Sequence, residues 1–154
     1  MIAPIVFQTL LKSRARLAHI LSETSPEHLE RVPKGFNNNI WWNAVHTLVV
    51  QQLLCYKLSG LPLHIDDSLV ADYSKGTYPG TLPEAAARDA ISDLLIRTPR
   101  QLEQDYQQGI FETYAPYTTS AGVTLQRIED GILFNLYHEG LHMGSILSLL
   151  KVVR

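Results

Sequence analysis

Residues 137–144 read YHEGLHMG and place two histidines, His138 and His142, four positions apart. If this segment is a helix, the two side chains lie one turn above the other on the same face. Most other residues on that face are apolar, Ile128, Ile146 and Leu149 among them, so the face is predicted to point into a core. Two adjacent buried imidazoles both need polar partners, and one bound metal ion would satisfy both.

A third histidine occupies a similar position earlier in the chain. In a helix predicted from about Ile40 to Ser59, His46 lies on a face that is mostly apolar. We therefore expect three residues to bind a divalent metal ion: His46, His138 and His142. Three further residues on the same helix faces are expected to line a pocket beside it: Trp42, Asn43 and Asn135.

The positions of these histidines along their helices predict the topology. At about 1.5 Å per residue, His46 lies roughly 10 Å from the start of its helix and His142 roughly 15 Å from the end of the last helix. The two levels coincide only if these helices are antiparallel, whereas simple up-down-up-down order would make them parallel. The third helix must then run parallel to the second, and their connection must cross the bundle. Residues 61–82 are long enough to be that crossover.

Proline, glycine and capping residues divide the chain into four long helical segments. Thr98-Pro99 indicates that the third helix kinks or restarts there. No segment has a convincing strand pattern, so the predicted fold is an all-α four-helix bundle formed by a single domain, residues 1–154. The long helices are expected at about Ile5–Glu23, Ile40–Ser59, Pro83–Gln108 and Thr124–Val152, with a short helical turn near Asp67–Tyr73.

Composition narrows the partners and the location. The 154 residues carry a formal net charge of −2 and their basic residues form no long run, so we expect no nucleic-acid partner. No apolar run approaches the roughly 18 residues that a membrane-spanning helix needs, so we expect no membrane partner. Cys55 is the only cysteine, which excludes an intramolecular disulfide and makes a cytoplasmic location the expectation.

The same stretch matches the H-E-x-x-H pattern of zinc peptidases, in which the glutamate activates water. Such peptidases usually draw a third ligand from downstream, and no acidic residue or histidine follows His142. A peptidase is therefore only a remote alternative. Two roles remain open for Glu139: a general base at the metal, or a side chain that points toward a neighbouring helix or solvent.

Two other catalytic arrangements are not favoured. A diiron site would need a second Glu-x-x-His pair, and the second helix has Asn43 where that pair would need glutamate. Cys55 lies about 180° round its helix from His46 and faces away. The hydroxyl-rich loop of residues 109–122 is expected near the start of the last helix, far from His138.

Two segments carry a resemblance to a known family. Residues 38–62, NNIWWNAVHTLVVQQLLCYKLSGLP, and residues 128–151, IEDGILFNLYHEGLHMGSILSLLK, resemble the DinB/YfiT-like superfamily of metalloenzymes. The resemblance implies a four-helix bundle with a long crossover between helices two and three, and often a homodimer. It also implies a zinc or nickel ion at His46, His138 and His142. Family activities include transfer and isomerisation reactions that use low-molecular-weight thiols.

Three imidazoles without a fourth protein ligand are typical of catalytic metal sites, in which water or substrate completes the coordination. A metal ion in such a site lowers the pKa of a bound water or thiol. Together with what the family resemblance implies, this pattern favours a metal-dependent transferase, using a thiol, or a hydrolase, acting on a small molecule. The alternative from another class is a non-catalytic helical bundle that binds a metal or another ligand.

Overall fold

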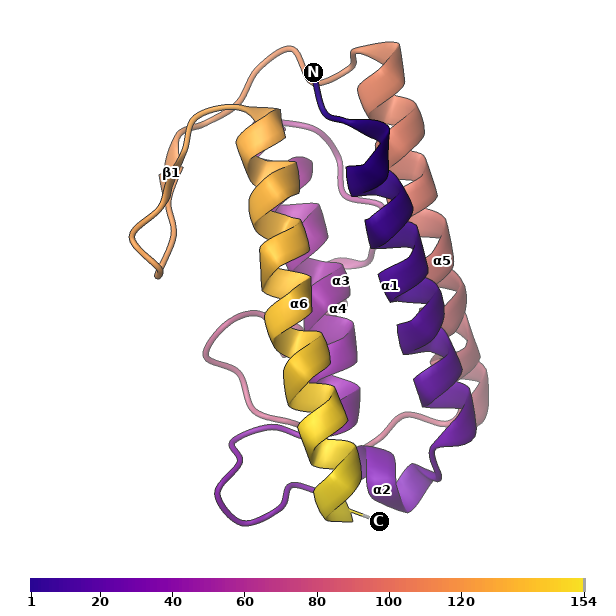
Figure 1. Ribbon diagram of the computed structural model, residues 1–154. Helices are drawn as coiled ribbons and strands as arrows, with labels where there is room; N and C mark the ends of the chain where they lie inside the picture. Colours follow the sequence, from indigo (N-terminus) through magenta and orange to yellow (C-terminus); the bar gives the residue numbers. More distant parts are fainter. Residues whose placement is uncertain (154) are drawn as a thin grey trace.

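The computed structural model describes residues 1–153, and helices dominate it, as predicted. Four long helices lie side by side: α1 (Pro4–Glu23), α3 (Ile40–Cys55), α5 (Ala85–Gln108) and α6 (Ile128–Val153) (Figure 1). The shorter elements are α2 (Pro26–Glu30), the 3-10 helix η1 (Lys57–Ser59), α4 (Asp67–Tyr73), β1 (Tyr117–Thr118) and β2 (Thr124–Leu125).

The chain direction differs from simple up-and-down order. In Figure 1, α1 and α6 run from the top downward, whereas α3 and α5 run upward. The connection between α3 and α5 therefore crosses the length of the bundle, and it carries α4 behind α3 (Figure 1). This is the antiparallel arrangement of α3 and α6 that the depth of the histidines predicts.

Local sequence determines the helix ends. The Asn39 side chain accepts a hydrogen bond of 2.7 Å from the Trp42 amide and caps α3. Ser25 caps α2 in the same way through the His28 amide. At the other end, Gly109 stops α5 with a φ of 73°, a left-handed conformation that costs glycine little.

The segment before the last helix departs from the prediction. Residues 117–118 and 124–125 pair as a short antiparallel hairpin, so the expectation of no strand is wrong. Because Thr124 and Leu125 are paired in β2, α6 begins at Ile128 rather than at Thr124. The hairpin extends outward from the top of α6 and back alongside it (Figure 1).

The third long helix does not restart at proline. α5 is continuous through Pro99, which removes only one backbone donor from the helical ladder. Leu95 and Leu102 are fully buried on either side of it, and their packing holds the helix together. The Thr98 hydroxyl donates to the Leu94 carbonyl at 2.8 Å.

The core consists of two apolar clusters. One, around Leu17, Leu48 and Ile146, fills the end of the bundle near α2, and the other, around Leu10 and Leu102, fills the opposite end. Buried polar side chains lie between the two clusters on every long helix: Arg14, Thr47, Gln51, Thr98, Asn135 and Glu139. We call this set the polar layer.

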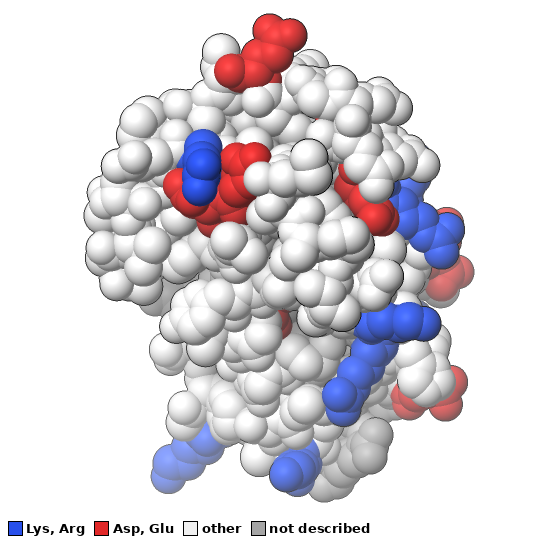
Figure 2. Space-filling model, turned by 45° about the horizontal axis from the view of Figure 1, so that its top comes forward, with Lys and Arg blue, Asp and Glu red and all other residues white. Residues whose placement is uncertain are grey.

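Over the face drawn in Figure 2, acidic and basic side chains are interspersed, and neither sign forms a continuous patch. None of the helices in the described range has the length and apolar character needed to cross a membrane.

The close approach of α3 and α6 at Gly131 gives a first prediction. A Cβ there would lie 2.6 Å from the Tyr114 hydroxyl and 3.1 Å from the Leu54 carbonyl oxygen. Gly131→Ala is therefore expected to lower the free energy of unfolding by about 1–3 kcal/mol, measured by urea denaturation. Gly140→Ala, in the same helix with no neighbouring atom within 4 Å of the new Cβ, is the control and should raise it by about 0.5–1 kcal/mol. Equal changes in stability for the two variants would contradict the close packing at Gly131.

Candidate metal centre

The three predicted histidines meet between α3 and α6. His46 comes from the first half of α3, and His138 and His142 come from successive turns of α6. One ring nitrogen of each lies within 4.8 Å of the others, and the two Nε2 atoms of His138 and His142 are 3.1 Å apart. Within residues 1–153, this is the one group of three or more His, Cys, Asp or Glu side chains close enough to hold a metal ion.

Two of the imidazoles are oriented by hydrogen bonds from their other nitrogen. His46 Nδ1 lies 2.6 Å from the Tyr73 carbonyl oxygen, which can only accept. His142 Nδ1 lies 2.7 Å from Asn43 Oδ1, and Asn43 Nδ2 donates to the Asn39 carbonyl. Both Nδ1 atoms therefore donate, which leaves the Nε2 lone pairs free. Metal-binding histidines usually donate the N–H of their other ring nitrogen to a carbonyl or carboxylate oxygen in this way.

His138 shows why a cation fits between these rings. Its Nδ1 is buried and has no hydrogen-bond partner among the described residues, and its Nε2 faces the lone pair on His142 Nε2. If the His138 ring carries its proton on Nδ1, that N–H has no acceptor, and the lone pairs of the two Nε2 atoms face each other. If it carries the proton on Nε2, the lone pair of Nδ1 has no donor. A cation between the two Nε2 atoms would replace this repulsion between lone pairs by two attractive contacts. Zn–N bonds of about 2.0–2.1 Å in tetrahedral geometry would place the two nitrogens about 3.3 Å apart, close to the observed spacing.

The imidazoles are held in the neutral form that metal binding requires. Burial lowers the pKa of His138 to about 3, with help from the neighbouring histidines and Arg14. Burial and the proximity of His46 lower the pKa of His142 to about 4. Burial also lowers the pKa of His46, although its hydrogen bond to the Tyr73 carbonyl acts in the opposite direction. All three rings are therefore neutral near pH 7, so a metal ion does not have to displace a proton from them.

Two adjoining cavities open beside the histidines. One, of about 300 Å³, is walled mainly by apolar side chains of α3 and α6, including Val50, Leu53 and Phe134. The other, of about 430 Å³, has a polar wall that includes Asn37, Asn38 and Thr77. Both are bordered by the same four residues: His46, Lys75, Ser120 and His138. The space around the site therefore combines an apolar wall with a polar one.

Of the side chains expected to line the pocket, Trp42 borders the polar cavity and the two asparagines border neither. Trp42 stacks on His46 with ring centroids 4.4 Å apart, and its Nε1 donates to the Thr77 hydroxyl. Asn43 instead orients His142. Asn135 is fully buried and donates to Glu139 at 2.9 Å, so it belongs to the polar layer.

Glu139 points away from the histidines, toward α1. Its carboxylate accepts hydrogen bonds of 2.9 Å and 2.7 Å from Nε and Nη2 of Arg14, and both side chains are almost completely buried. Arg14 also donates to the Thr47 carbonyl and to Gln51 of α3. These bonds, together with one from Asn135, hold the carboxylate against the buried guanidinium and direct it away from the histidines. The structure therefore supports a structural role for Glu139 over that of a general base at the metal.

Arg14 is the residue that sequence reasoning missed. It lies on the apolar face of α1, in line with Phe7, Leu10 and Leu21. A basic residue in the middle of an apolar helical stripe is a signal for a buried ion pair, because an unpaired charge is too costly to bury. The spacing of residues along the sequence does not indicate that Glu139, rather than another acidic residue, is the partner of Arg14.

The hairpin loop corrects another expectation. Its hydroxyl groups were expected far from His138, but Tyr117, Thr119 and Ser120 border the cavities that reach this histidine. The reason is the late start of α6, which lets the hairpin extend back along the helix (Figure 1). Cys55, by contrast, is fully buried outside both cavities, and burial raises the pKa of its thiol.

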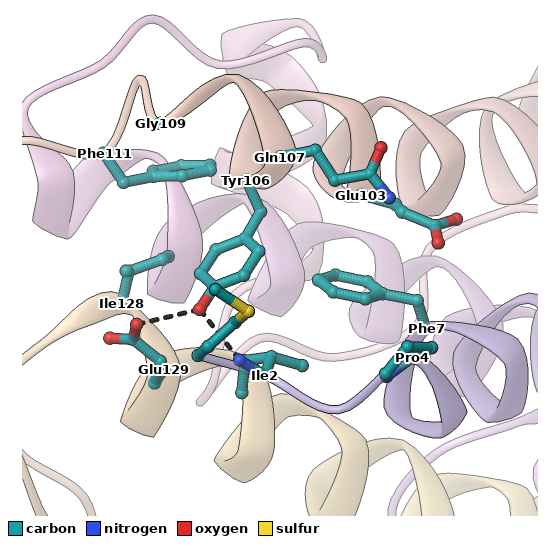
Figure 3. Close-up of a pocket in the computed structure, with 11 residues that line it drawn as sticks. Ile2, Pro4, Phe7, Glu103, Tyr106, Gln107, Gly109, Phe111, Ile128 and Glu129 are labelled. Atoms are coloured by element: carbon teal, nitrogen blue, oxygen red, sulfur yellow. Dashed lines mark hydrogen bonds between the residues drawn. The ribbon is translucent and has the colours of Figure 1, made fainter.

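A separate cavity of about 600 Å³ lies at the end of the bundle where α1 and α6 begin (Figure 3). The Tyr106 hydroxyl stands at its centre, donates to Glu129 at 2.8 Å and accepts from the Ile2 amide at 2.9 Å. Glu103 and Glu129 are its charged side chains. It contains no histidine, and Ile128 is about 15 Å along α6 from His138.

A comparison with protein families assigns the chain. The family model described as the DinB superfamily matches residues 9–146, a range that includes all three histidines and the crossover. The chain belongs to the DinB superfamily. A comparison with curated proteins gave no match. The three-histidine cluster and the membership of this superfamily fit a metal-binding protein.

The ion pair between Arg14 and Glu139 gives a second prediction. Arg14→Met and Glu139→Gln each leave one charge buried without its partner, so each should lower the free energy of unfolding by about 3–5 kcal/mol. The double variant should lose less than the sum of the two. Arg16→Met, at an exposed position of the same helix, should change it by less than about 0.5 kcal/mol. Urea denaturation measures all four, and an unchanged stability of Glu139→Gln would contradict the structural role of the carboxylate.

Proposed function

We propose that this DinB-superfamily protein is an enzyme in which His46, His138 and His142 bind one divalent ion, zinc or nickel, and which transfers a low-molecular-weight thiol to a small electrophilic substrate. The observation that supports it best is the convergence of three neutral imidazoles beside two cavities, without a fourth His, Cys, Asp or Glu ligand among residues 1–153. Sites with an open coordination position are typical of catalysis rather than of structural metals.

The surroundings of the histidines favour a thiol over water as nucleophile. A divalent ion supplies Lewis acidity and lowers the pKa of a thiol or water that it binds. Hydrolysis usually also needs a general base within reach of the attacking water. The nearest acidic side chain in sequence, Glu139, is occupied by Arg14, and no Asp or Glu borders either cavity. A thiolate, once formed, needs no such base.

In the proposed transfer, the thiol proton passes to solvent and the sulfur forms a bond to an electrophilic carbon of the second substrate. The bond from that carbon to its leaving group breaks, and the leaving group departs with the electron pair. The protein contributes the orientation of the histidines by Tyr73 and Asn43, and a wall that shields one side of the site from water. Hydrolysis by the same site is the second candidate.

Metal content is the first test. Protein purified without an affinity tag or added metal is expected to carry close to one zinc or nickel ion per chain by mass spectrometry. Substituting alanine for His46, His138 or His142 should reduce this to background, because two imidazoles bind a divalent ion far more weakly than three. His19→Ala, on the exposed face of α1, is the control and should leave it unchanged. Full metal content in His138→Ala would contradict the proposed site.

Turnover separates the two enzymatic candidates from a binding module. With metal-loaded protein, a small thiol and an activated alkyl halide, we expect product formation well above that of the free ion, and its loss in His46→Ala. Ester hydrolysis without any thiol would instead support the hydrolase. Retained metal with neither activity would favour a non-catalytic metal-binding bundle.

We also propose a homodimer that forms through the outer face of α6. Leu133, Tyr137 and Leu141 are each about half exposed there at helical spacing, with exposed fractions of 50%, 55% and 52%. The exposed positions of this face between Leu133 and Ser148 carry no charged side chain, so two copies can meet without like-charge repulsion. The family resemblance also implies a homodimer, which supports this proposal.

Sedimentation equilibrium tests this interface. The protein is expected to sediment as a dimer, and Tyr137→Glu or Leu141→Glu should convert it to a monomer, because two charges would then be buried at the contact. Val32→Glu introduces the same charge at an exposed apolar position in the α2–α3 connection and should remain dimeric. A monomeric starting protein, or a dimer unaffected at either position, would contradict the proposal.

A further inference from the structure

The charges that border the histidine site are all of one sign. Lys57 borders the apolar cavity, Lys75 borders both cavities, and neither cavity has an aspartate or glutamate in its wall. On the face drawn in Figure 2 both signs are interspersed, and the charged side chains that border the cavity of Figure 3 are both glutamates. Among residues 1–153, neither lysine forms an ion pair with a carboxylate.

A metal ion bound by the three histidines would add to the positive charge of Lys57 and Lys75. The three imidazoles are neutral ligands, so a divalent ion that they bind keeps its two positive charges. The nearest buried carboxylate, Glu139, is already neutralised by Arg14. A ligand that enters beside the histidines therefore meets an electropositive environment with partly apolar walls, in which Coulomb interactions are stronger than in bulk water.

The two cavities also differ in what they offer to the body of a ligand. Val50, Leu53 and Phe134 supply apolar surface on one side of His46 and His138. Asn37, Asn38 and Thr77 supply hydrogen-bonding groups on the other side. Lys75, in the crossover just after α4, stands where the two cavities adjoin.

We propose that the site selects a small organic anion with an apolar body, and that Lys75 is the specificity-determining residue that pairs with its anionic group. The inference rests on the proposed function, because the metal ion supplies part of the positive charge. The apolar body of the ligand packs against α3 and α6, and the ammonium group of Lys57 adds to the positive potential at the entrance. A cationic ligand of the same size is excluded by repulsion from both lysines and the metal ion.

Three thiols of equal chain length test the sign of the ligand: mercaptohexanoate, mercaptohexanol and aminohexanethiol. Their binding to protein loaded with cobalt(II) is followed by the visible spectrum of the ion, which reports thiolate binding separately from any turnover. We expect the carboxylate to bind about tenfold more tightly than the alcohol, and the amine more weakly than both. Because the attraction is screened, the difference should shrink as salt concentration rises.

Variants assign the effect to Lys75. Lys75→Ala should remove the preference for the carboxylate and leave the dissociation constant of the alcohol unchanged, and Lys75→Arg should keep the preference. Lys12→Ala, an exposed lysine of α1 outside both cavities, is the control. Equal affinities for the three thiols, an unchanged preference in Lys75→Ala, or no binding of any thiol to the loaded protein would overturn the inference while the metal site stands. Failure of the protein to take up cobalt would overturn both.

Discussion

The buried ion pair between Arg14 and Glu139 is the interaction on which the arrangement of the bundle depends. An arginine in the middle of the apolar face of α1 must find a carboxylate, because leaving it unpaired in the core would cost several kcal/mol. Glu139 supplies that carboxylate from α6, and the Thr47 carbonyl and Gln51 supply further acceptors from α3. Gln51 in turn donates to the Thr98 carbonyl of α5. The polar layer thus links all four long helices at one level between two apolar clusters, and it restricts how far any helix can slide along the others.

That level is also the level of the candidate metal centre. Glu139 lies between His138 and His142 in the sequence, about 60–100° round the helix from them. The contact that holds Glu139 against Arg14 of α1 therefore fixes the rotation of α6 and directs both histidines toward α3. His46 then meets them because α3 and α6 are antiparallel, and Tyr73, carried by the crossover, fixes its ring through a backbone carbonyl. The H-E-x-x-H pattern therefore divides between two tasks. Its histidines face the candidate metal centre and its glutamate pairs with Arg14, whereas in a zinc peptidase the glutamate activates water.

Much of this arrangement was predictable, and the exceptions have physical reasons. Apolar periodicity and capping residues predicted the four long helices, and the start of α3 and the end of α5 were predicted correctly because Asn39 and Gly109 act locally. By contrast, α3 ends at Cys55 rather than Ser59, and α6 begins at Ile128 rather than Thr124. The depth of His46 and His142 along their helices predicted the antiparallel pairing, because a shared site requires equal levels. The hairpin and its approach to His138 were missed, since pairing of four residues is decided by tertiary contacts that leave little trace in so short a segment. Asn135 and Asn43 were expected to line the pocket, but they border neither cavity. Their partners, Glu139 and His142, depend on side-chain geometry that a helical wheel does not contain.

In the proposed site, three imidazoles from α3 and α6 bind one ion and leave an open position for a substrate. X-ray absorption spectroscopy of the metal-loaded protein tests it most directly, because it reports the number and type of ligand atoms. We expect a shell with three imidazole nitrogens at about 2.0–2.1 Å for zinc, completed by one or two light atoms from solvent. Addition of a small thiol should replace one of these by sulfur at about 2.3 Å. A shell with fewer than three imidazoles, or one closed by four protein ligands, would contradict an open three-histidine site.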